Sequence, residues 1–72
     1  MNDLATKIHA ILAQHTIFAT PILTAQCNYL KKTTDTIDRD DLPKLSAHLA
    51  RAVALFSNPG SAQKIEAAIK AL

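Results

Sequence analysis

The chain has 72 residues, 49% of them hydrophobic, and its eight Lys or Arg against six Asp or Glu give a net charge of +2 at pH 7. This length predicts a single small domain, residues 1–72, and so weak a charge does not indicate nucleic-acid binding. One cysteine excludes an intramolecular disulfide, and no apolar run approaches the roughly 20 residues that cross a membrane. Chains this short often need a disulfide, a metal or a partner subunit for stability, so we expect self-association.

The first predicted helix begins at Asn2 or Asp3, either of which can cap it, and runs to about His15 or Ile17. Its apolar positions recur at steps of three and four residues, which is the helical period. His15 is expected at the edge of the core, with a backbone carbonyl as its partner. The expected apolar stripe is Leu4, Ile8, Ile11, Leu12, His15 and Phe18.

The second predicted helix begins at Thr20-Pro21, where a hydroxyl can cap the helix and a proline fits the first helical position. Its apolar residues again follow steps of three and four. A run of β-branched threonines weakens its end, so we expect fraying near Thr34 to Thr36. The expected seam is Leu23, Cys27, Leu30, Thr34 and Ile37.

The third predicted helix follows Asp40 and Asp41, whose carboxylates can cap it, and carries Pro43 in its first turn. It runs to Phe56, before a segment rich in turn residues, 57–61, ends it. Alanine or apolar residues occupy most of its circumference, so it must be covered on more than one side. We therefore expect it to be the central helix or to pack against a second protein. Its principal seam is Leu42, Leu45, Leu49, Ala52 and Phe56, with Val53 adjacent.

A fourth helix is predicted from about Pro59 or Ser61 to Leu72, with Asn58 as its cap. Its apolar positions are Ala62, Ile65, Ile69 and Leu72. No segment alternates as a half-buried strand does. The sequence therefore predicts an all-α fold: a compact bundle of four short helices in which sequential helices are antiparallel neighbours.

The outer face of the third helix is the candidate partner-binding surface. It presents a line of residues at steps of four, three and four, beside small residues that would let another helix approach closely. The line is Lys44, His48, Arg51 and Leu55, and the small residues are Ala47, Ala50 and Ala54. In one interpretation Leu55 is covered by the first or fourth helix; in the other this face binds a partner helix or an acidic peptide. Tyr29 and Ile22, on the flank of the second helix, form a second candidate surface.

Catalytic, metal and cofactor sites are not indicated. One glycine cannot make a phosphate-binding loop, and Cys27, mid-helix among apolar neighbours, is expected to be a buried residue with a raised pKa. The three histidines lie at helical positions that do not converge, and the acidic connector of residues 35–41 lacks the oxygen spacing of an EF-hand loop. We expect no enzyme, no metal and no cofactor, although a site formed between subunits stays an alternative.

The expected function is that of a small protein-interaction module, an adaptor, co-chaperone or regulator, working as a homo-oligomer in the cytoplasm, where an unpaired cysteine is usual. Leu55→Asp or Ala50→Glu is then expected to abolish the complex while leaving helicity intact. The alternative is a dimeric nucleic-acid-binding regulator whose phosphate contacts come from Lys31, Lys32, Lys44 and Arg51.

Overall fold

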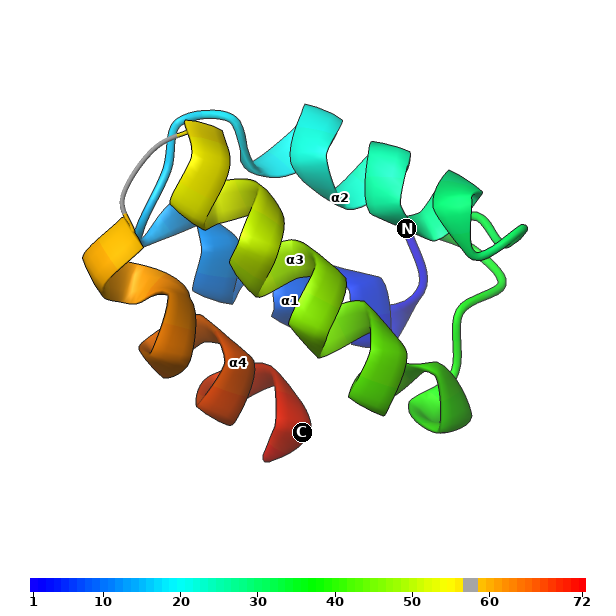
Figure 1. The fold of residues 1–72 in the computed structure, drawn as a ribbon. Helices are drawn as coiled ribbons and strands as arrows, with labels where there is room; N and C mark the ends of the chain where they lie inside the picture. The colour runs from blue at the N-terminus through cyan, green and yellow to red at the C-terminus, as the bar shows by residue number, and fades with distance from the viewer. Residues whose placement is uncertain (57–58) are drawn as a thin grey trace.

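The computed structural model describes residues 1–56 and 59–72, which form four α-helices and two short 3-10 helices (Figure 1). No strand occurs in these residues. The elements in chain order are α1 (Asp3–Ala13), α2 (Ala19–Tyr29), η1 (Arg39–Asp41), α3 (Leu42–Phe56), η2 (Pro59–Ser61) and α4 (Ala62–Lys70). The Cα radius of gyration is 10.4 Å, close to the ~11 Å expected of a compact chain of this length. The prediction of an all-α bundle is confirmed.

Each helix runs antiparallel to the one before it, and α3 lies between α2 and α4 with α1 behind (Figure 1). Helix α3 packs against α2, α4 and both 3-10 helices, which makes it the most extensively contacted element, as its apolar circumference predicted. Among the described residues, no helix combines the length and apolar character that a membrane span requires.

The core is a single cluster to which every α-helix contributes. Helix α3 supplies Leu45, Leu49 and Val53, which are fully buried. The predicted stripes on α1 and α4 account for Ile8, Leu12, Ile65 and Ile69, which are also fully buried. Burial of aliphatic side chains at these spacings is what holds so short a chain together.

Asn2 caps α1, as one of the two predicted alternatives. Its Oδ1 accepts a hydrogen bond from the Ala5 N–H at 2.8 Å, and its Nδ2 donates to the Ile37 carbonyl at 2.8 Å. The N-terminal ammonium adds an ion pair with Asp35 at 3.0 Å. The acidic connector is therefore tied to the start of α1.

Helix α2 differs from its prediction at both ends. Phe18 occupies the N-cap position without a side-chain hydrogen bond, whereas the Thr20 hydroxyl lies inside the first turn, 2.9 Å from Nε2 of His9. At the other end Lys31 adopts a left-handed conformation, with φ of 61°, and the Lys32 N–H donates to the Cys27 carbonyl. The bond from Lys32 to Cys27 is the one that defines a Schellman termination, in which Lys31 occupies the left-handed position where glycine is usual. The helix thus ends before the threonines.

The start of α3 also differs from its prediction, because its cap lies further upstream. Asp38 accepts from the Asp40 N–H, and Asp41 accepts from the Asp38 N–H at 3.0 Å, which together make a capping box around η1. Lys32 lies 3.6 Å from the Asp41 carboxylate and 3.9 Å from that of Asp38. The connector is thus a paired and capped turn.

Helix α4 follows directly from η2 and ends at Lys70, two residues before the predicted end. Ile65 and Ile69 are buried as expected, whereas Leu72 is only partly buried. The predicted cap, Asn58, lies outside the described residues.

Candidate partner-binding surface

The outer face of α3 is exposed to solvent, as one of its two interpretations required. Lys44, Ala47 and Arg51 are exposed, and His48 and Ala54 are partly buried. Leu55 is 73% exposed, so neither α1 nor α4 covers it. The interpretation in which Leu55 packs within the fold is therefore wrong, because the buried side of α3 is centred on Leu45 and Leu49.

Ala50 does not belong to this exposed face. It is only 5% exposed, and it lies on the buried side of α3. Its small side chain is thus enclosed within the fold, whereas the sequence pattern predicted that it would face a partner helix. Ala50 is therefore corrected from a partner-binding residue to a buried one.

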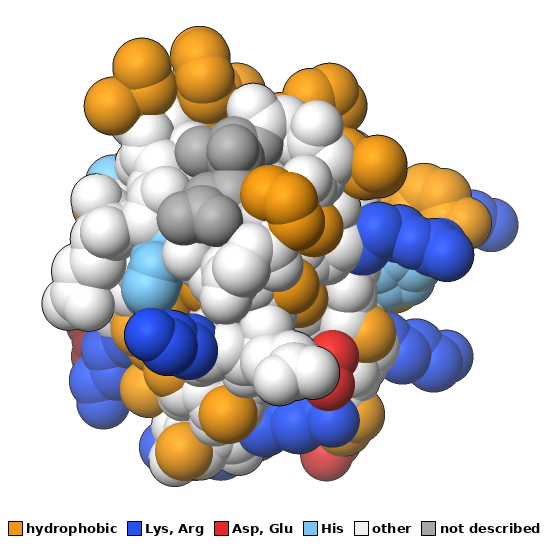
Figure 2. Space-filling model, turned by 60° about the vertical axis from the view of Figure 1, so that its left-hand side comes forward, with side chains coloured by type: hydrophobic (Ala, Val, Ile, Leu, Met, Phe, Trp, Pro, Cys, Tyr) orange, Lys and Arg blue, Asp and Glu red, His pale blue; other side chains and the backbone are white. Residues whose placement is uncertain are grey.

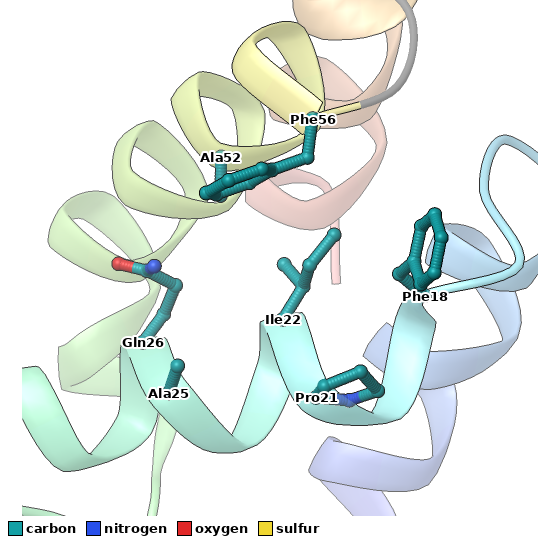
Figure 3. A pocket seen from close by; sticks show the side chains of 7 residues that line it. All are labelled: Phe18, Pro21, Ile22, Ala25, Gln26, Ala52 and Phe56. Atoms are coloured by element: carbon teal, nitrogen blue, oxygen red, sulfur yellow. The ribbon is translucent and has the colours of Figure 1, made fainter.

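An apolar groove lies between the N-terminal half of α2 and the C-terminal end of α3 (Figure 3). Its volume is about 400 Å³. Phe18, Ile22 and Gln26 point from α2 toward α3, and the ring of Phe56 lies over Ala52. Pro21 and Ala25 complete the lining at the outer side of α2.

The two phenylalanines of the groove were predicted to be core residues and are not. Phe18 is 48% exposed and Phe56 is 70% exposed. Both stand at a helix terminus, Phe18 just before α2 and Phe56 as the last residue of α3, where neighbouring helices no longer cover them. The sequence signal that could have placed them there is their closeness to Pro21 and Pro59, which mark helix boundaries.

Two further exposed hydrophobic residues are sequence neighbours of the groove phenylalanines, although neither lines the groove. Ile17 directly precedes Phe18, and Leu55 directly precedes Phe56. Figure 2 shows hydrophobic side chains gathered along the upper edge of the molecule in that view. An isolated exposed leucine needs no explanation, but a set of large apolar side chains around a groove is typical of an interaction surface.

The two residues of the second candidate surface, Tyr29 and Ile22, do not share one exposed surface in the structure. Ile22 is buried and lines the groove, whereas Tyr29 is 70% exposed and lies against His48 with the ring centroids 4.8 Å apart. This ring pair joins α2 to α3 one turn beyond Gln26 and Ala52. It therefore lies outside the groove, beyond the end opposite to the two phenylalanines.

The four candidate phosphate contacts are not equivalent. Lys44 and Arg51 are exposed on α3, while Lys31 and Lys32 follow α2. Lys32 is paired with the carboxylates of the capping box, so a phosphate would have to compete with Asp38 and Asp41 for it. Lys32 is therefore a poorer candidate for a phosphate contact, which weakens the nucleic-acid interpretation.

The three histidines each have a different neighbour. His9 is hydrogen-bonded to Thr20, His48 lies against Tyr29, and Nδ1 of His15 lies 3.1 Å from the Ser61 hydroxyl. His15 is partly buried, as expected, and its contact ties the end of α1 to the start of α4. Within residues 1–56 and 59–72, no group of three His, Cys, Asp or Glu side chains could hold a metal ion.

Cys27 is fully buried in α2, as predicted. Burial raises the pKa of its thiol, and the nearby Asp41 charge raises that pKa further. A raised pKa and a buried sulfur both oppose nucleophilic reactivity, which requires an accessible thiolate. Cys27 is a packing residue in this fold.

Iodoacetamide is therefore expected to alkylate Cys27 more than about 100-fold more slowly in the folded protein than in urea, because the thiol becomes accessible only on opening. Mass spectrometry of timed samples measures both rates. Comparable rates in the two conditions would show that the thiol is exposed.

The raised pKa also fixes the sign of a pH effect. Above the ordinary pKa of cysteine, about 8.5, the unfolded chain releases the thiol proton while the folded chain keeps it. The free energy of unfolding should therefore fall as pH rises through this range. The difference between the wild type and Cys27→Ala isolates this contribution from that of other titrating groups.

Comparison of the chain with protein-family models, with curated proteins and with solved structures gives no match. Any function for the chain therefore has to be inferred from its own surface.

Proposed function

We propose that this chain is a non-enzymatic protein-interaction module, an adaptor, co-chaperone or regulator that binds a partner in the groove between α2 and α3. The observation that carries the proposal is the apolar groove of about 400 Å³ bordered by two exposed phenylalanines. Apolar side chains at such positions contribute little to the stability of the monomer but a great deal to an interface, where aromatic anchors dominate the binding energy.

The burial pattern supports this proposal over one in which the exposed residues are merely incidental. Small monomers rarely leave several large apolar side chains together on the surface. Here Ile17 and Phe18 directly precede α2, and Leu55 and Phe56 are the last two residues of α3. A partner that covers them would remove much of the exposed apolar area of the chain from water.

The test is affinity capture with the intact chain, followed by direct binding of the recovered protein. Phe56→Ser removes the groove aromatic, and Tyr29→Ser removes an aromatic side chain of equal exposure that lies outside the groove. We expect a partner that binds the purified wild type and the Tyr29 variant and loses at least about tenfold in affinity for the Phe56 variant.

Three outcomes would contradict the proposal. One is that no captured protein binds the purified chain directly. Another is that Tyr29→Ser weakens binding while Phe56→Ser does not, which would move the site to the second candidate surface. The third is a loss in both variants with a parallel loss of helicity, seen by circular dichroism, since Phe56 would then be structural.

The predicted homo-oligomer is tested separately, by sedimentation velocity of the wild type and of Leu55→Asp. If the outer face of α3 mediates self-association, the wild type sediments as a dimer or larger species, and the variant as a folded monomer. A wild-type monomer at micromolar concentration excludes stable self-association there.

The alternative function, a dimeric nucleic-acid-binding regulator, draws on the exposure of Lys44 and Arg51 on a helix without carboxylates. Its test is the ultraviolet absorbance of the natively purified protein, which has no Trp and one Tyr and so absorbs weakly by itself. Bound nucleic acid that salt removes, and that Lys44→Glu with Arg51→Glu abolishes, would favour this alternative.

A further inference from the structure

The charges around the groove are distributed unevenly. The sequence has no Asp or Glu from Leu4 to Thr34, and none from Leu42 to Ile65. Helices α2 and α3, which build the groove, therefore carry no carboxylate, while α3 presents Lys44 and Arg51 on its exposed face. The acidic residues lie in the connector and at the start of α1, apart from Glu66, which is paired with Lys70 at 3.2 Å.

Of these two cations Arg51 is next to the groove, on its α3 side, whereas Lys44 lies two turns further along α3. On α3, Arg51 and Leu55 occupy the helix surface next to Ala52 and Phe56, which line the groove. On the α2 side, the exposed residues next to the lining are Thr20, Thr24 and Asn28, all uncharged. Figure 2, in which the face nearest the viewer of Figure 1 has turned to the right, shows Lys and Arg side chains along the right-hand edge and others at the left and the bottom, with acidic side chains only in the lower half.

The dimensions of the groove match two turns of a helix. Its lining on α2 runs from Phe18 to Gln26, which spans about 12 Å at 1.5 Å per residue. A partner helix of that contact length places its residues at i, i+4 and i+7 on one side. The exposed phenylalanines border one end of this span, and the ring pair of Tyr29 and His48 lies beyond the other end, outside the lining.

We infer that the occupant of the groove is an amphipathic helix of another protein, with aliphatic or aromatic residues facing the groove and carboxylates on the flank that faces α3. This inference rests on the proposed function and adds the chemistry of the partner. Carboxylates at that flank pair with Arg51, which sets the orientation of the helix, while the apolar contacts supply most of the affinity.

A second copy of the chain fits the groove less well. The faces that could enter it, on α2 and α3, bear no carboxylate, so the cations of both copies would stay uncompensated. The acidic connector has the right charge, but its one large aliphatic residue, Ile37, is buried in the chain's own core. Within residues 1–56 and 59–72, the exposed large apolar side chains of α2 and α3 and the acidic connector lie on separate parts of the chain.

The experiment uses the intact, isotope-labelled chain and three synthetic helical peptides of about 18 residues, long enough to be partly helical in solution. The first has leucine at i, i+4 and i+7 with glutamate on one flank. The second has lysine in place of glutamate, and the third has serine in place of leucine. Two-dimensional NMR identifies the amides that each peptide perturbs and gives the dissociation constants.

The glutamate peptide is expected to perturb the amides of Ile22, Ala25, Ala52 and Phe56, and to bind at least about tenfold more tightly than the lysine peptide. The serine peptide should not bind. In the chain with Arg51→Glu the preference should reverse, whereas Phe56→Ser should weaken both leucine peptides. Salt should reduce the preference, because the charges are exposed.

The inference is overturned if the lysine peptide binds as tightly as the glutamate peptide, although the groove would then still be an interaction site. It is also overturned if the groove amides shift with protein concentration alone, which would indicate a second copy, or if a DNA duplex or anionic vesicles perturb them more strongly than the peptide. Absence of any perturbation at about 1 mM peptide overturns the inference as well. The proposed function fails as well only if a captured partner binds the wild type and the Phe56→Ser variant equally tightly.

Discussion

Leu49→Ala is expected to lower the free energy of unfolding by about 2–5 kcal/mol. Leu49 is fully buried at the middle of the central helix, so its removal leaves a cavity that helices on two sides cannot both close. A domain of this length has a total stability of roughly 4–11 kcal/mol, so the variant should be partly unfolded near physiological temperature.

Leu55→Ala is the matched control, because it makes the same chemical change in the same helix. Leu55 is exposed, and alanine is at least as good a helix former as leucine, so the expected change is within about 0.5 kcal/mol. Urea denaturation followed by far-ultraviolet circular dichroism measures both variants, since the chain has no Trp for fluorescence. Equal costs for the two leucines would mean that the buried face of α3 is assigned wrongly.

Ala50→Glu is expected to destabilise the fold by about 3 kcal/mol or more, which reverses the outcome predicted from sequence. The side chain of Ala50 is buried, and a carboxylate placed there loses most of its hydration. The larger side chain also strains the close approach of the helices. Loss of helicity at room temperature, or a markedly lower urea midpoint, is the expected observation.

Ala47→Glu provides the control for this second prediction. Ala47 lies on the same helix but is exposed, so its substitution should change stability by no more than about 0.5 kcal/mol. If Ala50→Glu instead folds as stably as the wild type and loses only partner binding, then Ala50 belongs to the partner-binding face after all. The pair therefore separates a buried alanine from an interfacial one.

The sequence by itself was sufficient for the fold class and for most of the core. Residues such as Ile8, Leu45 and Ile65 recur at helical spacing among polar neighbours. Side chains at this spacing are all buried together when the segment forms an amphipathic helix that faces a core. The central place of α3 followed from its apolar circumference for the same reason. Cys27 was also predictable, because a cysteine in the middle of an apolar seam has no access to solvent.

Helix boundaries were less well determined, because competing local contacts decided them. Thr20 is a good N-cap residue, yet its hydroxyl bonds to His9 of a neighbouring helix instead of capping α2. Lys31 ends α2 in a conformation that favours glycine, and no propensity scale indicates a lysine there. Asp38, not Asp40 or Asp41, caps the turn that leads into α3, because the chain reaches it through the 3-10 helix.

The candidate site depended on the tertiary structure. Periodicity assigns a residue to a face of a helix but does not say where along the axis the neighbouring helix ends. Phe56 shares the seam of Leu49 and lies beyond the cover of its neighbours, so it is exposed, whereas Ala50 shares the face of Ala47 only approximately and is buried. The sequence determined which residues are apolar and how they are spaced. Only the packing of the helices decided which of them are left over to form a groove, because exposure depends on the lengths and crossing of neighbouring elements.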